Sequence, residues 1–203
     1  MAQNIWNTLE KGAISKVAKV VLFEGVKTNM KIYLPAEGEL EEGADIWSER
    51  SDTVPVRVLY SKKMHFFSGP EKSSQSDLPP PPTKILLHMH GGGFIALSSR
   101  SMQSITRRWA NELNVPILSI DYRMAPGHPF PTPGYDCLAV YKFVVGHIRK
   151  YMNVDPQEIY LTGDSAGGNL SCVLTGLVMR EKLPPPKGLY LVYPAADLRL
   201  RFS

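Results

Sequence analysis

Gly163-Asp164-Ser165-Ala166-Gly167 has the form Gly-x-Ser-x-Gly and stands between a short apolar run, residues 159–162, and a helix-like stretch, residues 166–180. A strand, a sharp turn and a helix in this order are typical of a nucleophile elbow, where a serine at the apex of a strained turn projects its hydroxyl above a sheet. Gly163 and Gly167 would let the strand and the helix approach each other without a clash of side chains. The pattern predicts Ser165 as a nucleophile; the alternative is that Ser165 only caps the helix.

A second motif, His90-Gly91-Gly92-Gly93-Phe94, also follows a strand-like run directly. A serine that attacks a carbonyl group needs hydrogen-bond donors aimed at the oxyanion that forms. Glycines can bring backbone N–H groups close to a substrate and can adopt a positive φ. The glycine run therefore predicts such donors, together with the N–H of Ala166 at the positive end of the following helix. A flexible loop is the alternative for the glycine run alone, but the two motifs in this order favour a catalytic site.

The rest of the chain alternates between strand-like and helix-like segments, which indicates an α/β fold with a mostly parallel sheet and helices on both faces. The expected strands are residues 84–89, 115–120, 158–162 and 188–193, and the expected helices are residues 101–113, 134–151 and 166–180. We expect four regions: an N-terminal helix and loop (1–53), a first strand region (54–67), a Pro/Ser-rich linker loop (68–83) and the front part of a catalytic domain (84–203). The apolar stripe of residues 5–22 predicts an amphipathic helix: a cap, lid or membrane-touching helix over the site, or a helix docked on the body of the protein.

Composition and charge describe a soluble globular protein: of 203 residues, 43% are hydrophobic and 21% are charged, and the net charge is +4. The basic residues are scattered and not interleaved with aromatic residues, so nucleic acid is not an expected partner. This charge is compatible with peripheral attraction to an anionic membrane surface. Cys137 and Cys172 lie in apolar helix-like segments without metal-type spacing, so we expect buried free thiols in a reducing compartment and no metal site. We see neither a transmembrane span nor a secretory signal, and expect a cytoplasmic protein.

Four motifs together resemble the hormone-sensitive lipase family of α/β-hydrolases. They are residues 90–94, residues 121–126 (Asp-Tyr-Arg-Met-Ala-Pro) with Phe130-Pro131, residues 163–169, and Tyr193-Pro194. The resemblance covers about residues 84–198. It implies an α/β-hydrolase fold and hydrolysis of acylglycerols or related lipid esters, without a cofactor, by a protein that contacts lipid droplets peripherally. It also implies Ser165 as the nucleophile, and oxyanion donors at Gly92, Gly93 and Ala166.

The same resemblance implies supporting roles around this site. His90 would shape the glycine run and would not act as a base, and residues 121–123 would lie in a loop that buttresses the site. Asp164 precedes the nucleophile, and its side chain would point elsewhere, so we expect a structural hydrogen bond from it and no catalytic role. Gly91, Gly163 and Gly167 complete the supporting set.

The partners that a serine nucleophile needs are not found after Ser165. In α/β-hydrolases the acid and then the histidine follow the serine along the chain. All five histidines precede it here: His65, His88, His90, His128 and His147. Asp197 does follow, but we expect a structural role for it. We therefore expect the triad Asp and His to be absent, the fold to be incomplete at its C-terminus, and the 203 residues alone to be inactive. The alternative is a non-catalytic ligand-binding protein of the same fold.

Overall fold

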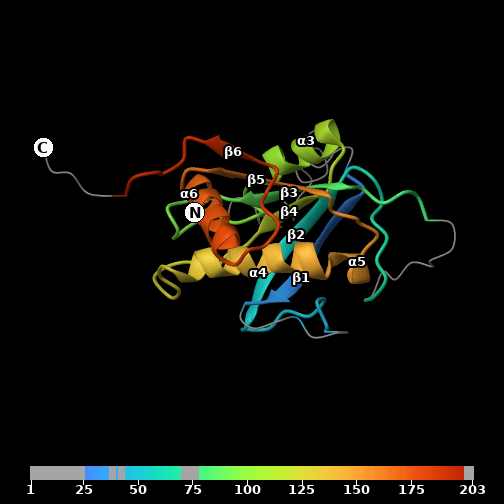
Figure 1. Ribbon diagram of the computed structural model, residues 1–203, viewed down its shortest axis with the longest axis horizontal. Coiled ribbons are helices and arrows are strands. Elements are labelled where there is room, and N and C mark those ends of the chain that lie inside the picture. Colours follow the sequence, from blue (N-terminus) through green and yellow to red (C-terminus); the bar gives the residue numbers. More distant parts are fainter. Residues whose placement is uncertain (1–25, 37–39, 41–43, 70–77, 199–203) are drawn as a thin grey trace, which may run out of the picture.

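In the computed structural model of the chain, the described residues are 26–36, 40, 44–69 and 78–198. They form a six-stranded sheet in the order β1-β2-β4-β3-β5-β6, flanked by helices (Figure 1). The strands are β1 (Thr28–Pro35), β2 (Thr53–Tyr60), β3 (Lys84–Met89), β4 (Ile117–Ile120), β5 (Glu158–Asp164) and β6 (Gly188–Val192). The helices are α3 (Gln103–Leu113), α4 (Thr132–Gly146), the short α5 (Ile148–Tyr151) and α6 (Ala166–Arg180).

The four central and outer strands β4, β3, β5 and β6 run parallel, whereas β2 pairs antiparallel with both β1 and β4. Parallel neighbours need a crossover connection, and here α3, α4 and α6 supply the three crossovers. The alternation of strands and helices in the sequence thus predicted the mostly parallel sheet correctly.

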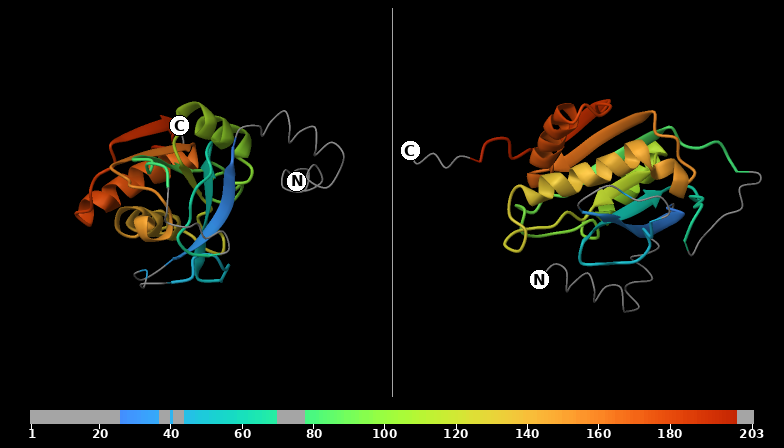
Figure 2. Two further views of the ribbon diagram at one scale, coloured as in Figure 1. Left: turned by 90° about the vertical axis from the view of Figure 1, so that its right-hand side faces the viewer. Right: turned by 60° about the horizontal axis from the view of Figure 1, so that its bottom comes forward.

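Helices cover both faces of the sheet. The long helices α4 and α6 lie together on one face, and α3 lies on the other (Figures 1 and 2). The larger core fills the space under α4 and α6, where Tyr141, Val144 and Leu174 are buried against the strands. A smaller cluster under α3 contains Leu86, Ala110 and others. Each face of the sheet therefore buries an apolar cluster under its helices.

Two elements differ from the sequence-based expectations. The helix expected over residues 134–151 is interrupted at His147, which separates α4 from α5. Strand β1 was not expected, although residues 28–35 form eight register pairs with β2. The amphipathic helix expected over residues 5–22 lies outside the described residues.

The two cysteines have different environments. Cys137 on α4 is a buried free thiol, as expected, and burial raises its pKa. Cys172 is free but exposed, so the expectation of burial was wrong for it. The buried face of α6 contains Leu170, Leu174 and Val178, which recur at helical spacing, and Cys172 lies on the opposite face.

The parallel strands end along one edge of the sheet. The loops that follow β3, β4 and β5 carry the glycine run, the segment that begins with Asp121, and Ser165 respectively. Ligands of open α/β sheets bind outside the carboxyl ends of the strands. The topology therefore brings together motifs that lie far apart in the sequence.

Candidate active site

Ser165 occupies the sharp turn between β5 and α6. Its φ of 49° and ψ of −115° lie in a region that residues other than glycine rarely adopt. Its backbone is held by β6 and the segment after it: Ser165 N–H donates to Val192 O (3.0 Å), and Ala195 N–H donates to Ser165 O (3.0 Å). A strained conformation persists only where its surroundings impose it, and strain of this kind clusters at functional sites. The half-buried serine has the backbone geometry of a nucleophile elbow.

The glycines on either side of the serine are required by close backbone approach. A Cβ built on Gly167 would collide with the carbonyl oxygen of Met89, and one built on Gly163 would collide with Gly167 itself. Strand β5, helix α6 and the end of β3 therefore meet without intervening side chains, as the pattern predicted.

The loop of residues 90–99, here called the glycine loop, is folded tightly at the end of β3. Gly92 has a φ of 109° and Gly93 a φ of 64°, and the non-glycine residues Phe94 and Leu97 also have positive φ values of 64° and 70°. The carbonyl oxygen of Gly92 accepts hydrogen bonds from the N–H groups of residues 95 and 96, at 3.2 and 3.1 Å. Four positive φ values within six residues define a conformation that the loop would not keep unless it were held in place.

Asp164 ties the glycine loop to the elbow. Its Oδ1 accepts a hydrogen bond of 2.9 Å from the N–H of Gly91, which is buried. The fit is close, since a Cβ on Gly91 would collide with the Asp164 carboxylate. The carboxylate beside the serine thus makes the structural hydrogen bond expected from the sequence, and it fixes one motif relative to the other.

The arrangement leaves backbone donors free at the edge of the sheet. No described residue accepts a hydrogen bond from the N–H of Gly92 or Gly93. The N–H of Ala166 is the first of α6, and the first N–H groups of a helix have no partner within it. Such groups could receive the negative charge that develops on a carbonyl oxygen under attack by Ser165.

Two histidines, His88 near the end of β3 and His90 at the start of the glycine loop, are buried, and burial favours the neutral form of each ring. Burial, reinforced by the nearby His90, lowers the pKa of His88 to about 3, and burial also lowers the pKa of His90. Nδ1 of His88 lies 2.7 Å from the hydroxyl of Ser119. Nδ1 of His90 lies 2.7 Å from Gly91 O and therefore donates to it. Nε2 of His90 is buried and has no hydrogen-bonding partner among the described residues, so it makes no hydrogen bond to Ser165.

The segment after β4 buttresses the glycine loop from the other side. The ring of Tyr122 stacks on His90 at a centroid distance of 4.3 Å, and its hydroxyl donates to His90 O at 2.7 Å. Farther along, Ala125 N–H donates to Phe94 O (3.0 Å). These contacts agree with the supporting role expected of residues 121–123.

Sequence reasoning missed a residue that holds this segment. Asp136 on α4 is fully buried, and its carboxylate accepts hydrogen bonds from the backbone N–H and the guanidinium of Arg123, the shortest at 2.8 Å. The only signal in the sequence was an acidic residue within an apolar helix. Asp197, by contrast, is exposed.

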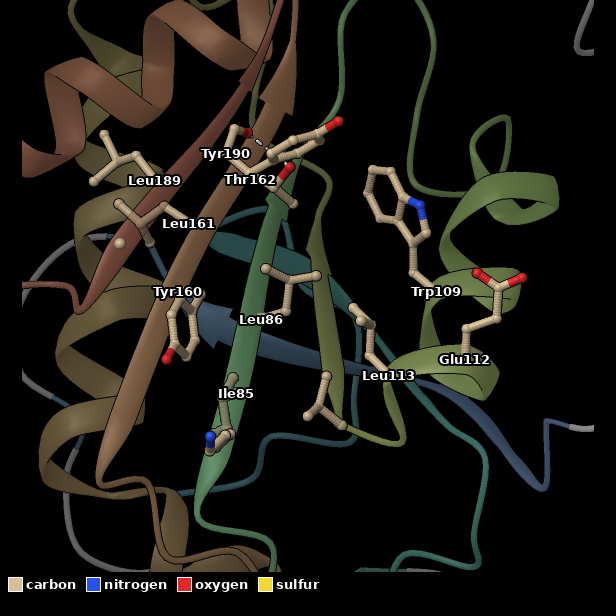
Figure 3. Close-up of a pocket in the computed structure, with 13 residues that line it drawn as sticks. Ile85, Leu86, Trp109, Glu112, Leu113, Tyr160, Leu161, Thr162, Leu189 and Tyr190 are labelled. Carbon is tan, nitrogen blue, oxygen red and sulfur yellow. Dashed lines mark hydrogen bonds between the residues drawn. The ribbon is translucent and has the colours of Figure 1, made fainter.

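One prominent cavity in the described part of the chain lies away from the serine. It is an open, mainly apolar groove of about 760 Å³ between α3 and the sheet, seen in Figure 3. In that view Trp109, Leu113, Leu86 and Tyr160 are among the side chains drawn along its walls. Neither Ser165 nor the glycine loop lines the groove. We therefore locate the candidate active site from its chemistry, at the carboxyl edge of the sheet.

The fold and site define a class of protein, and comparison with known proteins identifies the same class. A family profile described as the alpha/beta hydrolase fold matches residues 86–203, and the chain belongs to that family. Among solved structures, the thermophilic carboxylesterase EstE1 from a metagenomic library superposes with a TM-score of 0.67 at 26% identity, covering 98% of this chain and 56% of that one. The hyperthermophilic esterase of Pyrobaculum calidifontis gives a TM-score of 0.67 at 25% identity, covering 96% of this chain and 53% of that one.

Relatives of known function indicate which α/β-hydrolases this chain resembles in sequence. The hormone-sensitive lipase of Homo sapiens is 38% identical over 161 residues, which are 79% of this chain and 14% of the lipase. The ethyl acetate hydrolase of Pseudomonas putida is 32% identical over 117 residues, which are 57% of this chain and 36% of that enzyme. Within the α/β-hydrolases, the chain belongs to the hormone-sensitive lipase family. It spans only a small part of the length of these curated relatives, and a little over half of the solved esterases. In the described residues, no helix has both the length and the apolar character needed to cross a membrane.

Proposed function

We propose that this chain carries the nucleophile and the oxyanion donors of a carboxylic ester hydrolase. The observation that supports it most strongly is the backbone of Ser165, at positive φ between a strand and a helix, joined through Asp164 to a glycine loop with free N–H groups. The names of the relatives, which include lipases and carboxylic ester hydrolases, support the same reaction.

In the proposed reaction, Ser165 Oγ attacks the carbonyl carbon of the ester and its proton passes to a general base. The carbonyl oxygen becomes an oxyanion that accepts hydrogen bonds from the N–H groups of Gly92, Gly93 and Ala166. The C–O bond to the alcohol then breaks, the alcohol leaves with a proton, and an acyl-serine remains for attack by water. Each donor of this kind contributes about 10²–10³ to turnover.

The general base in this class of enzyme is a histidine that follows the serine along the chain. No histidine follows Ser165 in the 203 residues. We therefore propose that the 203-residue polypeptide turns over esters slowly by itself. Rapid hydrolysis of a nitrophenyl ester that disappears in Ser165→Ala would contradict this part of the proposal.

For the substrate we propose an acylglycerol or a related lipid ester. Two large apolar side chains stand exposed on loops at the carboxyl edge of the sheet: Ile95, 68% exposed, on the glycine loop and Phe130, 83% exposed, after β4. They would suit an acyl chain or the surface of a lipid droplet, which the protein would contact from the cytoplasm. A comparison of binding to triolein emulsions between the wild type and Phe130→Ser tests this part, and equal binding would reject a contact through Phe130.

Selective labelling tests the central proposal. A fluorophosphonate probe is added to the folded 203-residue chain and, as a baseline, to the chain unfolded in urea, and the modified serines are mapped by mass spectrometry. We expect selective labelling of Ser165 in the folded chain, because the oxyanion donors accelerate attack even without a complete triad. Ser165→Ala should abolish this adduct. If Ser165 is labelled no faster in the folded chain than in the unfolded one, a non-catalytic ligand-binding protein of the same fold becomes the better explanation.

A further inference from the structure

A buried serine terminates the glycine loop and is bound to a carboxylate through two of its atoms. Ser99 is fully buried; its N–H donates to Asp121 Oδ1 (2.5 Å) and its hydroxyl to Asp121 Oδ2 (2.8 Å). Asp121 follows β4 directly, and its own N–H donates to Pro55 O on β2 (2.9 Å). The end of the glycine loop is thus attached to the sheet through Asp121.

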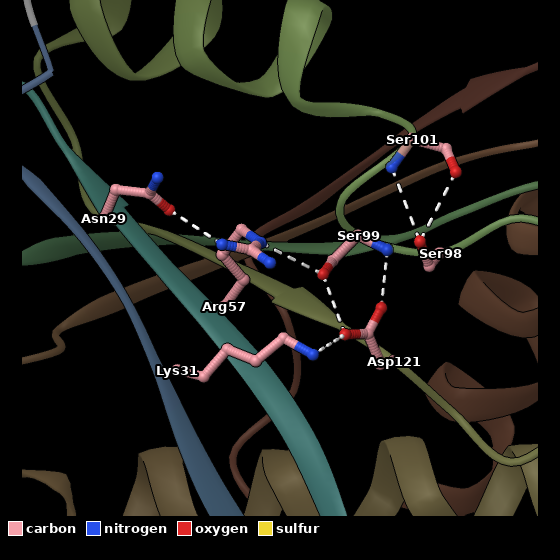
Figure 4. A network of polar contacts seen from close by, with 7 residues as sticks. All are labelled: Asn29, Lys31, Arg57, Ser98, Ser99, Ser101 and Asp121. Carbon is pink, nitrogen blue, oxygen red and sulfur yellow. Dashed lines mark hydrogen bonds and ion pairs between the residues drawn. The ribbon is translucent and has the colours of Figure 1, made fainter. Parts of the chain in front are cut away.

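Two cations on the antiparallel strands complete this attachment, as Figure 4 shows. Lys31 Nζ, on β1, lies 3.0 Å from Asp121 Oδ2. Arg57, on β2, donates from Nε to Ser99 Oγ (3.3 Å) and from Nη1 to Asn29 Oδ1 (3.0 Å). We call Lys31, Arg57, Ser99 and Asp121 the distal anchor. It links four segments that are distant in the sequence: β1, β2, the glycine loop and the end of β4.

The distal anchor contains a guanidinium that is partly removed from water. Burial lowers the pKa of Arg57, which means that the guanidinium has lost much of its hydration. Burying a charge destabilises a fold unless the charge is paired and hydrogen-bonded. Here the compensating groups are Asp121, Ser99 and Asn29, and two of these three also lie on the path to the glycine loop. Arg57 is therefore connected to the end of the glycine loop through its hydrogen bond to Ser99 and its attraction to Asp121.

The glycine loop needs to be held at both ends because its conformation is strained. The four positive φ values lie between Gly91, which Asp164 fixes, and Ser99, which the distal anchor fixes. A residue other than glycine at such a φ costs about 1–3 kcal/mol unless its surroundings impose it. A loop released at one end would relax, and its free N–H groups would turn away from the serine.

We propose that Lys31 and Arg57 are positioning residues for the oxyanion donors, acting through Asp121 and Ser99. This inference rests on the proposed function, since it gives the glycine loop its catalytic purpose. Both residues lie outside the part of the chain that the family profile matches, residues 86–203. Strands β1 and β2, which form one edge of the sheet, would then support catalysis without contact with the substrate.

The test compares local with global effects in the 203-residue chain. Hydrogen exchange of the backbone amides is followed in the peptide of residues 90–99, global stability is measured by urea unfolding, and the fluorophosphonate labelling rate of Ser165 is measured in parallel. The variants are Lys31→Met, Arg57→Met and the conservative Lys31→Arg. Lys84→Met is the matched control, because it breaks an ion pair of similar length (Glu158, 3.3 Å) at the opposite end of the sheet.

We expect Lys31→Met and Arg57→Met to speed exchange of the glycine loop by roughly fivefold to tenfold, as loss of one such hydrogen bond would. Labelling of Ser165 should slow by a similar factor. Lys31→Arg should restore both values, and Lys84→Met should change neither. If Arg57→Met does not fold, the three lysine variants decide the question alone.

Unchanged loop exchange in Lys31→Met, or no recovery in Lys31→Arg, would overturn the proposal. If Lys31→Met and Lys84→Met lose the same global stability, and Lys31→Met does not change exchange in the glycine loop, the contact between Lys31 and Asp121 is merely structural. If the wild type shows no selective labelling of Ser165, the proposed function fails, whereas loop exchange still reports on the anchor.

Discussion

The hydrogen bond between Asp164 and Gly91 makes a testable contribution to stability. Replacing Asp164 with Ala removes the only acceptor that the described residues provide for the buried N–H of Gly91. A buried donor left without a partner costs about 1–3 kcal/mol, and the acceptor lost here is a carboxylate, so we expect a loss of about 2 kcal/mol in the free energy of unfolding. Asp164→Asn keeps an acceptor oxygen without the charge and should lose about 1 kcal/mol.

The assay is urea unfolding of the 203-residue chain, followed by tryptophan fluorescence and by circular dichroism to check that both report one transition. Hydrogen exchange of residues 90–99 is measured on the same samples. Asp52→Ala is the matched control, because that side chain is 69% exposed and pairs only with Arg50 at the surface. Exposed pairs contribute little, so this variant should stay within about 0.5 kcal/mol of the wild type.

Two outcomes would refute the reasoning about Asp164. One is a free energy of unfolding of Asp164→Ala within about 0.5 kcal/mol of the wild type, because a buried donor without a partner should destabilise the fold by more than that. The other is a glycine loop that exchanges as slowly in Asp164→Ala as in the wild type, because the two motifs would then be held together by something else.

Three further predictions use other parts of the molecule. Gly167→Ala should lower the free energy of unfolding in urea by about 3 kcal/mol, since the new Cβ would collide with the last carbonyl of β3. Gly176→Ala, with no neighbour within 4 Å of the new Cβ, should be neutral or slightly stabilising. Equal effects of the two substitutions would contradict the close approach at Gly167. With a folded pKa of about 3 for His88 against 6.5 unfolded, the free energy of unfolding should fall as the pH drops below 6.5, by roughly 2–3 kcal/mol between pH 7 and 4.5. A His88→Gln variant with the same pH dependence would refute His88 as the source. Iodoacetamide should modify exposed Cys172 in the folded chain and buried Cys137 only after unfolding; equal rates would contradict their different burial.

The sequence alone was sufficient for the local features of this protein. The elbow at Ser165 could be predicted because a strand, a turn and a helix are set by neighbouring residues, and because Gly163 and Gly167 are small enough for the close approach of backbone that an elbow needs. Apolar spacing likewise located α6 to the residue, from Ala166 to Arg180. Both features are short segments whose pattern lies within neighbouring residues, so the sequence was enough to locate them.

Other features depended on pairing across long distances in the sequence. Strand β1 is stabilised by its register with β2. The alternation of Met30, Ile32 and Leu34 is a strand signal in the sequence, but the segment is short and was assigned to the N-terminal helix and loop region. The interruption at His147 divides the expected helix into α4 and the short α5, and the apolar spacing did not reveal it. The exposure of Cys172, by contrast, follows from the spacing of Leu170, Leu174 and Val178 along α6, which the sequence itself contains.

The tertiary structure decided how the site is supported. The sequence by itself located the two motifs from which the chemistry is proposed, because the elbow pattern at Ser165 and the glycine run each follow a strand-like segment. Only the folded chain shows that Asp164 holds Gly91, and that Lys31 and Arg57 reach Asp121 and Ser99 from strands far upstream. The physical reason is that a hydrogen bond between side chains depends on which strands become neighbours, and the order β1-β2-β4-β3-β5 is a property of the whole sheet.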